Sequence, residues 1–335
     1  MTTVPRVSVL LPCRNAESTL REAVRSLVGQ TYGDIEVIAV DDGSTDSTSH
    51  LLAAWNERDS RVRVVCTEAR GIVATLNKAA ATARGELLAR MDADDVAAPQ
   101  RFEKQVELLD ATPALAACGT QVRYFPRDTV RDGARRYEEW VNSINTPKEI
   151  ERDLFVECPL PHPTLLVRRE AFERAGAYRD ARWPEDYDLV LRLWRAGYRL
   201  GKVAEPLLDW REGPDRLSRT DARYSEAAFR RCKVTYLEHR IRNRPVVICG
   251  SGPVGKAFAL ELQHQGHHVV AFLDLDPRKI GQTIHGAPVV KPTAIRDYPQ
   301  AYFLAAVASP ESRSEIRTYL SEAGLCEIAD FCAVA

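Results

Sequence analysis

The sequence predicts an α/β protein of two domains, each built on a sheet of largely parallel strands flanked by helices. The chain has 335 residues, a length that suggests about two domains. Strand-sized apolar runs alternate with helical patterns through the first hundred residues, and the alternation restarts near residue 245. Polar and acidic residues follow several of the apolar runs, at the strand ends where such sheets bind ligands.

The alternation of strands and helices in the first hundred residues predicts a doubly wound sheet. Its apolar runs are 6–11, 35–40, 62–66 and 87–91, and its helical patterns are 19–28, 45–57 and 72–83. A further helix is expected over 99–109, with Asp95 as its N-cap and Pro99 in its first turn. Residues 120–160 mix charge, aromatics and proline, so we expect them to cover the sheet rather than extend it. A helix over 186–195 ends before Gly197.

The renewed alternation of strands and helices near residue 245 defines the domain organisation. A polar, base-rich helical segment over 221–244 separates domain 1–220 from a smaller domain over 245–335. In the smaller domain we expect strands at 245–249, 269–274 and 302–308, with helices at 253–265 and 311–323. The smaller domain is thus expected to be a Rossmann-like α/β unit.

Composition excludes several classes of protein. The 46 Lys+Arg and 47 Asp+Glu residues nearly cancel, so no global field attracts nucleic acid. No apolar run approaches the roughly 18 residues of a membrane span, and the N-terminus does not resemble a secretory signal. The eight cysteines are scattered without a C-x-x-C pair, as expected of reduced thiols. These features predict a cytoplasmic protein.

An acidic run, Asp92-Ala-Asp94-Asp95, directly follows a predicted strand. Closely spaced carboxylates repel one another unless a cation lies between them, and hard oxygen ligands favour Mg²⁺ or Mn²⁺. An acidic loop that caps the next helix is the alternative. It explains Asp95 but leaves Asp92 and Asp94 without a reason.

A second acidic turn, Asp41-Asp42-Gly-Ser-Thr-Asp46, follows the neighbouring strand. A carboxylate here is suited to accept the N3–H of a uracil ring or the hydroxyls of a ribose. A turn with an N-cap accounts for Asp46. It does not account for two successive aspartates directly after an apolar strand.

Several segments, in this order along the chain, resemble the family 2 glycosyltransferases, which have the GT-A fold with its doubly wound mixed sheet. They cover about the first 220 residues and comprise 7–17, 27–31, 34–46, Gly71, Asn77, Gly85, 90–95, 162–169, 176–178, 185–193 and 206–211.

The resemblance implies a transfer of sugar from a nucleotide donor, most readily a UDP-sugar, with inversion at the anomeric carbon. The acceptor would be a glycan or a lipid-linked sugar of a cell-surface polysaccharide. The residues implied to bind the nucleotide sugar are Pro12, Asn15, Glu17, Asp41, Asp42, Asp92 and Arg211. Asp94 would be the principal metal ligand, helped by Asp92, and Asp186 would be the base, with Glu185 beside it.

Other interpretations of these residues remain open. Asp186 also suits a helix N-cap. Relatives often carry a histidine two residues after the position of Arg211; because this chain lacks it, Arg211, Arg216 or Arg219 would meet the phosphates, or the loop is simply solvated. His162 is implied to face the acceptor, although a hydrogen-bonded structural histidine fits equally well.

Trp183 offers an aromatic face for a sugar ring, with plain packing as the alternative.

The smaller domain carries a second candidate nucleotide site. Gly250, Gly252 and Gly255 follow a predicted strand and open a helix, and Asp274 ends the next strand. The segment resembles small nucleotide-binding domains attached to sugar-nucleotide-modifying enzymes, which implies NAD or another nucleotide as ligand.

No hydride-transfer set follows the second candidate site, so a dehydrogenase is disfavoured. A Rossmann-like unit used for packing or homo-oligomerisation is the alternative there. For the whole chain, the competing hypothesis is a non-catalytic nucleotide or NAD sensor that uses this smaller domain. Nucleotidyl transfer is disfavoured because no Gly-rich, basic phosphate loop follows the first strand. The basic helix at 230–244 leaves open a peripheral contact with the inner face of a membrane or with a lipid phosphate.

Overall fold

The computed structural model describes residues 4–213 and 216–335. These residues form two compact units. The first unit comprises Met1–Ile150, Pro159–Ala181 and Glu185–Thr220, and the second comprises Glu151–Cys158, Arg182–Pro184 and Asp221–Ala335. The helical segment expected between the domains, 221–244, therefore groups with the second unit.

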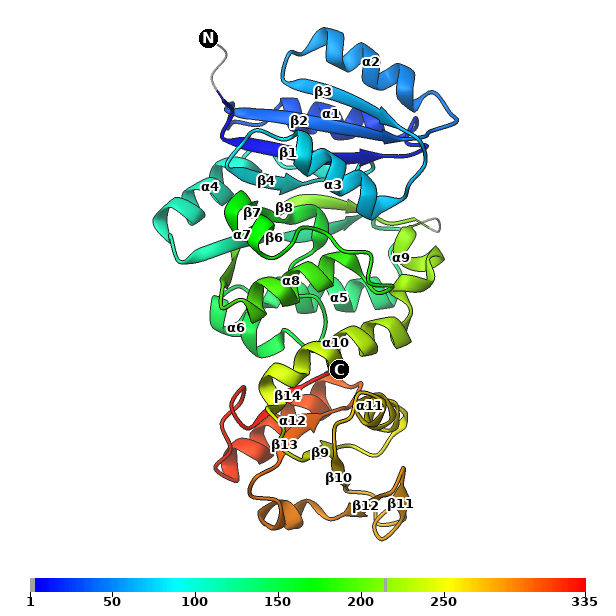
Figure 1. Cartoon of the computed structure of the whole chain (residues 1–335), viewed down its shortest axis with the longest axis vertical. Helices are drawn as coiled ribbons and strands as arrows, with labels where there is room; N and C mark the ends of the chain where they lie inside the picture. Colours follow the sequence, from blue (N-terminus) through cyan, green and yellow to red (C-terminus); the bar gives the residue numbers. More distant parts are fainter. Residues whose placement is uncertain (1–3, 214–215) are drawn as a thin grey trace. The chain divides into compact units, whose positions relative to one another are not determined.

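The first unit is built on one mixed sheet (Figure 1). Its strands are β1 (Val7–Cys13), β2 (Ile35–Asp42), β3 (Val62–Thr67), β4 (Leu87–Arg90), β5 (Val96–Ala97), β6 (Leu115–Phe125), β7 (Leu166–Arg168) and β8 (Arg199–Arg211). They are arranged in the order β3-β2-β1-β4-β7-β6-β8-β5. The first four are mutually parallel, as the alternation of strands and helices predicts.

The rest of the sheet contains antiparallel strands, so the sheet is mixed, as the resemblance to the GT-A fold implies. Strand β7 is antiparallel to both β4 and β6, β8 runs parallel to β6, and the short β5 is antiparallel to β8. Residues 120–125 belong to β6, so the expectation that 120–160 only covers the sheet is wrong for this stretch. The run is accommodated because its side chains alternate between buried and less buried positions as the strand leaves the core.

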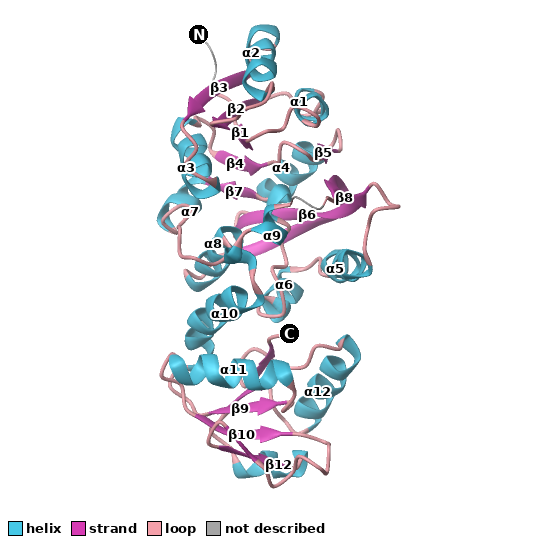
Figure 2. Ribbon diagram, turned by 90° about the vertical axis from the view of Figure 1, so that its right-hand side faces the viewer, coloured by secondary structure: helices cyan, strands magenta, loops and turns pink. Residues whose placement is uncertain are grey.

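Helices cover both faces of the sheet. They are α1 (Leu20–Val28), α2 (Thr48–Arg58), α3 (Ile72–Thr82), α4 (Arg101–Ala111), α5 (Asp132–Ser143), α6 (Pro147–Asp153), α7 (Arg169–Arg174), α8 (Glu185–Arg195) and α9 (Leu217–Thr220). Figure 2 shows α3 and α7 on one side of the strands and α1 and α4 on the other. Helix α4 begins at Arg101 with Gln100 as its N-cap residue, so the prediction that Asp95 caps this helix is wrong.

The second unit has its own sheet. Its strands are β9 (Val246–Cys249), β10 (Val269–Leu273), β11 (Thr283–Ile284), β12 (Ala287–Val290), β13 (Tyr302–Ala305) and β14 (Phe331–Ala333), in the order β11-β12-β10-β9-β13-β14. All pairings are parallel except that of β11 with β12. Its main helices are α10 (Glu226–Ile241), α11 (Pro253–His264) and α12 (Pro310–Glu322). Among the described residues, no helix is both long enough and apolar enough to span a bilayer.

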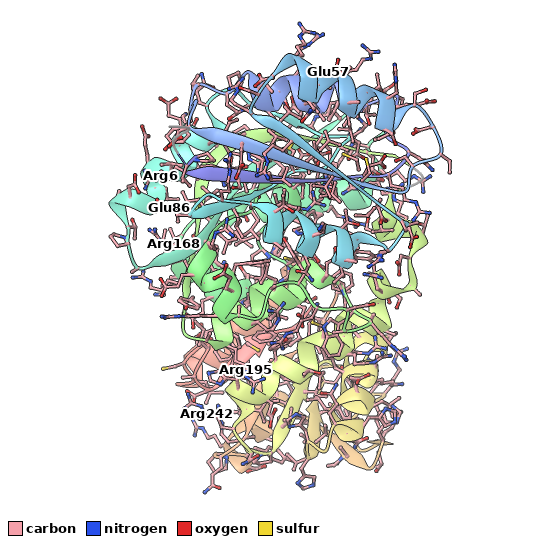
Figure 3. All side chains as sticks on the ribbon, turned by 45° about the horizontal axis from the view of Figure 1, so that its top comes forward. Arg6, Glu57, Glu86, Arg168, Arg195 and Arg242 are labelled. Atoms are coloured by element: carbon pink, nitrogen blue, oxygen red, sulfur yellow. The ribbon has the colours of Figure 1, made fainter. Side chains whose placement is uncertain are left out.

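Charged side chains tie the parallel strands of the first unit together near their amino ends. Glu36 on β2 is buried and accepts hydrogen bonds from Ser8 Oγ at 2.7 Å, from the backbone and Nε of Arg84 at 2.7 and 2.9 Å, and from Arg63 Nη1 at 3.0 Å. At the surface of this edge, Arg6 pairs with Glu86 at 2.7 Å (Figure 3). The opposite ends of the strands carry the candidate site.

Candidate active site

The acidic residues predicted from the sequence meet at the carboxyl ends of β1, β2 and β4. In the parallel register, Cys13 of β1 lies opposite Asp41 of β2, and Leu10 opposite Arg90 of β4. The chain that leaves β4 therefore passes beside the loop that leaves β1, and Thr19 Oγ1 donates to Ala93 O at 3.0 Å. The edge of the sheet thus brings together residues that lie about eighty positions apart.

The turn after β4 gathers three carboxylates. One oxygen from each of Asp92, Asp94 and Asp95 lies within 4.8 Å of the other two. Asp95 is 1% exposed; its Oδ1 accepts the backbone N–H of Arg211 at 2.8 Å, while its buried Oδ2 has no partner among the described residues. An orphaned buried oxygen beside two further carboxylates is a donor set that fits a hard divalent cation.

The electrostatics of this turn also favour a cation. Burial and the charge of Asp92 raise the pKa of Asp94 to about 6. Burial, together with the charges of Asp92 and Asp94, raises the pKa of Asp95 well above its usual range. The nearby arginines oppose these shifts without outweighing them, and a divalent ion would supply further positive charge.

A buried arginine borders the acidic turn. Arg90 is 3% exposed and its Nη2 donates to Asp92 Oδ1 at 2.5 Å. Its guanidinium also interacts electrostatically with Tyr178 and Glu185. Arg90 thus links the acidic turn with the start of α8. Its position before an acidic run was the only signal in the sequence, and sequence reasoning did not assign it a role.

The predicted base lies in the first turn of α8. Asp186 is partly exposed and its Oδ1 accepts the backbone N–H of Tyr187 at 2.7 Å, whereas Glu185 beside it is buried. Helix α8 already begins at Glu185, so Asp186 lies one residue inside the helix rather than at an N-cap. Its role as the base stays a prediction.

His162 belongs to the same neighbourhood. Its Nε2 lies 2.9 Å from the hydroxyl of Tyr178, and its Nδ1 lies 3.9 Å from Glu185 Oε1. Burial, helped by the charge of Arg90, lowers the pKa of His162 well below its usual value. The ring is therefore neutral at neutral pH and acts as a hydrogen-bonded partner of Tyr178, as the structural interpretation of His162 predicts.

The residues predicted to line the nucleotide pocket lie on the loops after β1 and β2. Pro12 is buried in β1, and the side chains of Asn15 and Glu17 accept backbone N–H groups of Thr45 and Ser47 at 2.9 and 3.0 Å. These contacts hold the two loops against each other and form one wall.

The two aspartates at the end of β2 are buried and fully engaged in shaping that wall. Asp41 accepts the backbone N–H of Ser44 at 3.0 Å and the hydroxyl of Ser49. Asp42 accepts the backbone N–H groups of Arg70 and Gly71 at 2.7 and 3.0 Å. In the described structure these carboxylates order the loops. The sequence predicts a turn that accounts for Asp46 but not for Asp41 and Asp42; their binding of a nucleotide stays a prediction.

Basic residues approach the acidic turn from the end of β8. Arg211 contacts the turn directly, through Asp94 and Asp95. Arg216 lies with its guanidinium carbon 4.5 Å from the ring centre of Trp210 and is held by Glu212 at 3.1 Å. The charge of Arg216 partly opposes the upward shifts in the pKa values of Asp94 and Asp95, so this side chain lies close to the candidate metal site.

Two predicted features lie in the second unit. Trp183 is part of the segment Arg182–Pro184, which groups with that unit, and its proposed role at the acceptor stays a prediction. In the glycine loop, a Cβ on Gly255 would lie 1.9 Å from Gly250 O, whereas one on Gly252 would meet open space. Helix α11 packs so closely on Gly250 that only glycine fits at position 255, so packing alone explains this glycine.

The carboxylate of Asp274 is engaged in hydrogen bonds with nearby residues of the same unit. It accepts from Ser251 N at 2.9 Å, Asp276 N at 2.9 Å and Lys279 Nζ at 3.1 Å. Burial opposes the charge of Asp274, but these hydrogen bonds outweigh it and hold the pKa well below the usual range. A nucleotide bound by this unit stays a prediction.

Comparison with known proteins identifies the first unit. The sequence profile of the family described as glycosyl transferase family 2 matches residues 8–176. The chain belongs to this family. It is 32% identical to EpsE of Bacillus subtilis, a protein named as a glycosyltransferase, over 67% of this chain and 80% of EpsE. It is 27% identical to the amylovoran biosynthesis glycosyltransferase AmsE of Erwinia amylovora, over 63% of this chain and 78% of AmsE.

Solved structures share the fold of this family 2 glycosyltransferase. TarS residues 1–349 of S. aureus in complex with UDP-GlcNAc align with a TM-score of 0.54 and 17% identity, over 70% of this chain and 66% of that chain. The mannosyltransferase PcManGT of Pyrobaculum calidifontis, in complex with GDP-Man and Mn²⁺, aligns with a TM-score of 0.52 and 22% identity, over 98% of this chain and 83% of that chain. These likenesses confirm the predicted GT-A fold.

Proposed function

We propose that this family 2 glycosyltransferase is a divalent-metal-dependent, inverting enzyme that moves a sugar from a UDP-sugar to a glycan or lipid-linked acceptor during the synthesis of a cell-surface polysaccharide. The observation that carries the proposal is the convergence of three carboxylates, with Asp95 Oδ2 buried and unpartnered among the described residues, at the edge of the sheet. The TarS structure with UDP-GlcNAc, the PcManGT structure with Mn²⁺ and the biosynthetic name of AmsE support the details.

The acidic turn would hold the metal. Asp94 and Asp92 offer partly exposed oxygens, and Asp95 offers its Oδ2. A bound Mn²⁺ or Mg²⁺ supplies positive charge to the diphosphate as it leaves. Arg216 adds a cation beside the same turn, and Arg219 shares Glu212 with it, so both are candidates to meet the phosphates in place of the missing histidine.

The transfer itself needs one base. An acceptor hydroxyl oxygen forms a bond to C1 of the donor sugar, its proton passes to the carboxylate of Asp186, and the bond from C1 to the phosphate oxygen breaks with its electron pair going to the nucleotide diphosphate. A single displacement of this kind inverts the anomeric carbon. The buried Glu185 next to Asp186, within 3.9 Å of His162, helps to fix the start of the helix that carries the base.

Turnover and binding by an Asp186→Asn variant test the proposal. With Mn²⁺ and a panel of UDP-sugars, the wild-type protein should release UDP when an acceptor is present. The variant should bind UDP as the wild type does but lose turnover by about 10²–10⁴-fold, the usual contribution of a general base. Asp209→Asn is the matched control, because Asp209 lies at the surface and pairs with Arg123 at 2.7 Å. Full activity in Asp186→Asn would contradict the assignment of the base, whereas a wild-type protein that binds UDP but shows no turnover would favour the sensor hypothesis.

A further inference from the structure

Arg211 is the last residue of β8 and meets the acidic turn with both its backbone and its side chain. Its backbone N–H donates to Asp95 Oδ1 at 2.8 Å, and its Nε donates to the backbone carbonyl of Asp94 at 2.6 Å. Its Nη2 donates to Glu22 Oε2 on α1 at 2.6 Å. Two of the three guanidinium nitrogens are therefore already engaged with the protein.

The strand register explains why Arg211 reaches this turn. Strand β5 directly follows the acidic turn and pairs antiparallel with β8, with Val96 opposite Asp209. Continuing that register by two residues places Asp94 opposite Arg211. The carboxylate of Asp95 thus accepts the backbone N–H that would otherwise project beyond the end of the two-residue ladder.

Packing holds the guanidinium of Arg211 in this position. Its carbon lies 4.3 Å from the ring centre of Phe125, which is opposite Arg211 in the β6–β8 register. The side chain is 24% exposed. An arginine that stacks on a ring and spans two acceptors has a fixed fork, and a lysine provides only a single charged point on a flexible stem.

The contacts of Arg211 leave one oxygen of Asp95 without a partner. The backbone N–H takes Asp95 Oδ1, and Oδ2 is buried with no partner among the described residues. By taking the carbonyl of Asp94, Nε fixes the backbone from which the Asp94 carboxylate projects. Outer partners of this kind orient the ligands of metal sites.

We propose that Arg211 is a positioning residue of the metal site, which shapes the Asp94-Asp95 turn and does not bind the nucleotide diphosphate. The proposal rests on the proposed function, because it takes the acidic turn as the metal site. It reassigns a residue that sequence analysis placed among the nucleotide-sugar ligands. Arg216, beside the same turn, and Arg219, which shares Glu212 with it, are left as the candidate cations for the phosphates.

The test measures Mn²⁺ binding without nucleotide, from the electron paramagnetic resonance signal of free Mn²⁺, in the full chain. Arg211→Ala should raise the Kd for Mn²⁺ by about 10–100-fold, the usual effect of losing an outer partner of a metal ligand. Arg211→Lys should recover part of this loss, since the amine can still reach the Asp94 carbonyl. Arg123→Ala, which removes a surface arginine from the neighbouring strand, should leave the Kd unchanged.

A second measurement separates positioning from phosphate binding. At Mn²⁺ concentrations that saturate the variant, Arg211→Ala should bind UDP with an affinity within about threefold of wild type, because the filled metal site restores the diphosphate contact. Glu22→Ala, which leaves both bonds to the turn in place, is a milder variant if Arg211→Ala does not fold. It should keep Mn²⁺ affinity within about threefold, since Glu22 is an exposed partner.

The outcomes are distinct. Wild-type Mn²⁺ affinity in Arg211→Ala, or UDP binding that stays weak at saturating Mn²⁺, would overturn the proposal and return Arg211 to the phosphate ligands. A wild-type protein that binds no Mn²⁺ would instead contradict the proposed function, and that result is seen before any variant is made.

Discussion

Glu36→Gln should destabilise the first unit, because Glu36 joins the central strands through four hydrogen bonds. The carboxylate is 1% exposed and receives its bonds from Ser8, Arg84 and Arg63. Gln keeps one carbonyl oxygen but brings an NH₂ group against an arginine, so at least one charge-assisted bond is lost and a donor is left facing a donor.

The magnitude follows from burial of the partners. Breaking a fully buried ion pair costs about 3–5 kcal/mol. The side chains of Arg63 and Arg84 are 38% and 46% exposed, so water can rehydrate them, and we expect a loss of about 2–3 kcal/mol in the free energy of unfolding. For a domain of this size, this loss lowers the Tm by about 4–12 °C.

The loss should depend on pH with a defined sign. Burial raises the pKa of Glu36, but the bonds from Ser8, Arg84 and Arg63 outweigh it and set the pKa below the usual 4.5. The stability from ionised Glu36 is therefore present above about pH 4.5 and is lost as the pH falls through the folded-state pKa. The difference in the free energy of unfolding between wild type and Glu36→Gln should therefore become smaller as the pH falls over this range.

Urea unfolding followed by tryptophan fluorescence measures this effect. Trp55, Trp140, Trp194 and Trp210 lie in the first unit, so the signal mainly reports that unit. Arg6→Ala, which breaks surface pairs only, is the control and should cost less than about 1 kcal/mol. Equal stability of Glu36→Gln and wild type at pH 7, or a difference in the free energy of unfolding that persists unchanged at pH 3, would show that ionised Glu36 does not stabilise the sheet.

Three further predictions concern the site and the second unit. Asp94→Asn should lower Mn²⁺ affinity by at least about tenfold in isothermal titration, because an amide oxygen carries no charge; unchanged affinity would exclude Asp94 as a ligand. In NMR spectra the imidazole of His162 should stay neutral from pH 8 to 6, because burial lowers its pKa well below 6.5, and a titration near pH 6.5 would be inconsistent with its buried bond to Tyr178. Gly255→Ala should unfold the second unit, as judged by limited proteolysis, because its Cβ would lie 1.9 Å from a backbone oxygen, whereas Gly252→Ala should be tolerated; equal resistance of the two variants would contradict the packing.

The parallel half of the fold could be predicted because it is encoded locally. Apolar runs and helical patterns alternate there, and each strand and helix expected from that alternation lies within three residues of its predicted bounds. The mixed sheet was implied by the resemblance, but two of its later strands could not be located from local patterns, because Leu166–Arg168 is too short to show a period and Leu115–Phe125 continues into a charged, aromatic stretch. Such strands form through partners distant in sequence, which no local pattern reports.

The candidate site divides in the same way. The acidic runs could be found because they follow apolar strands, and the sheet brings them to one edge. The resemblance assigned Arg211 to the nucleotide sugar, and the sequence could not predict its contact with the acidic turn, since Arg211 lies 116 residues from Asp95 and the contact depends on the β5–β8 pairing. The sequence suggested that Asp95 caps a helix, whereas in the structure Asp95 lies in the acidic cluster with Asp92 and Asp94.

Anomalous diffraction at the manganese edge, from crystals grown with Mn²⁺ and UDP, shows directly whether the acidic turn after β4 binds a divalent metal together with the nucleotide. We expect a single strong peak beside the carboxylates of Asp92 and Asp94, with UDP bound next to it. Clear density for UDP with no manganese beside Asp94, or manganese bound away from the diphosphate, would contradict it.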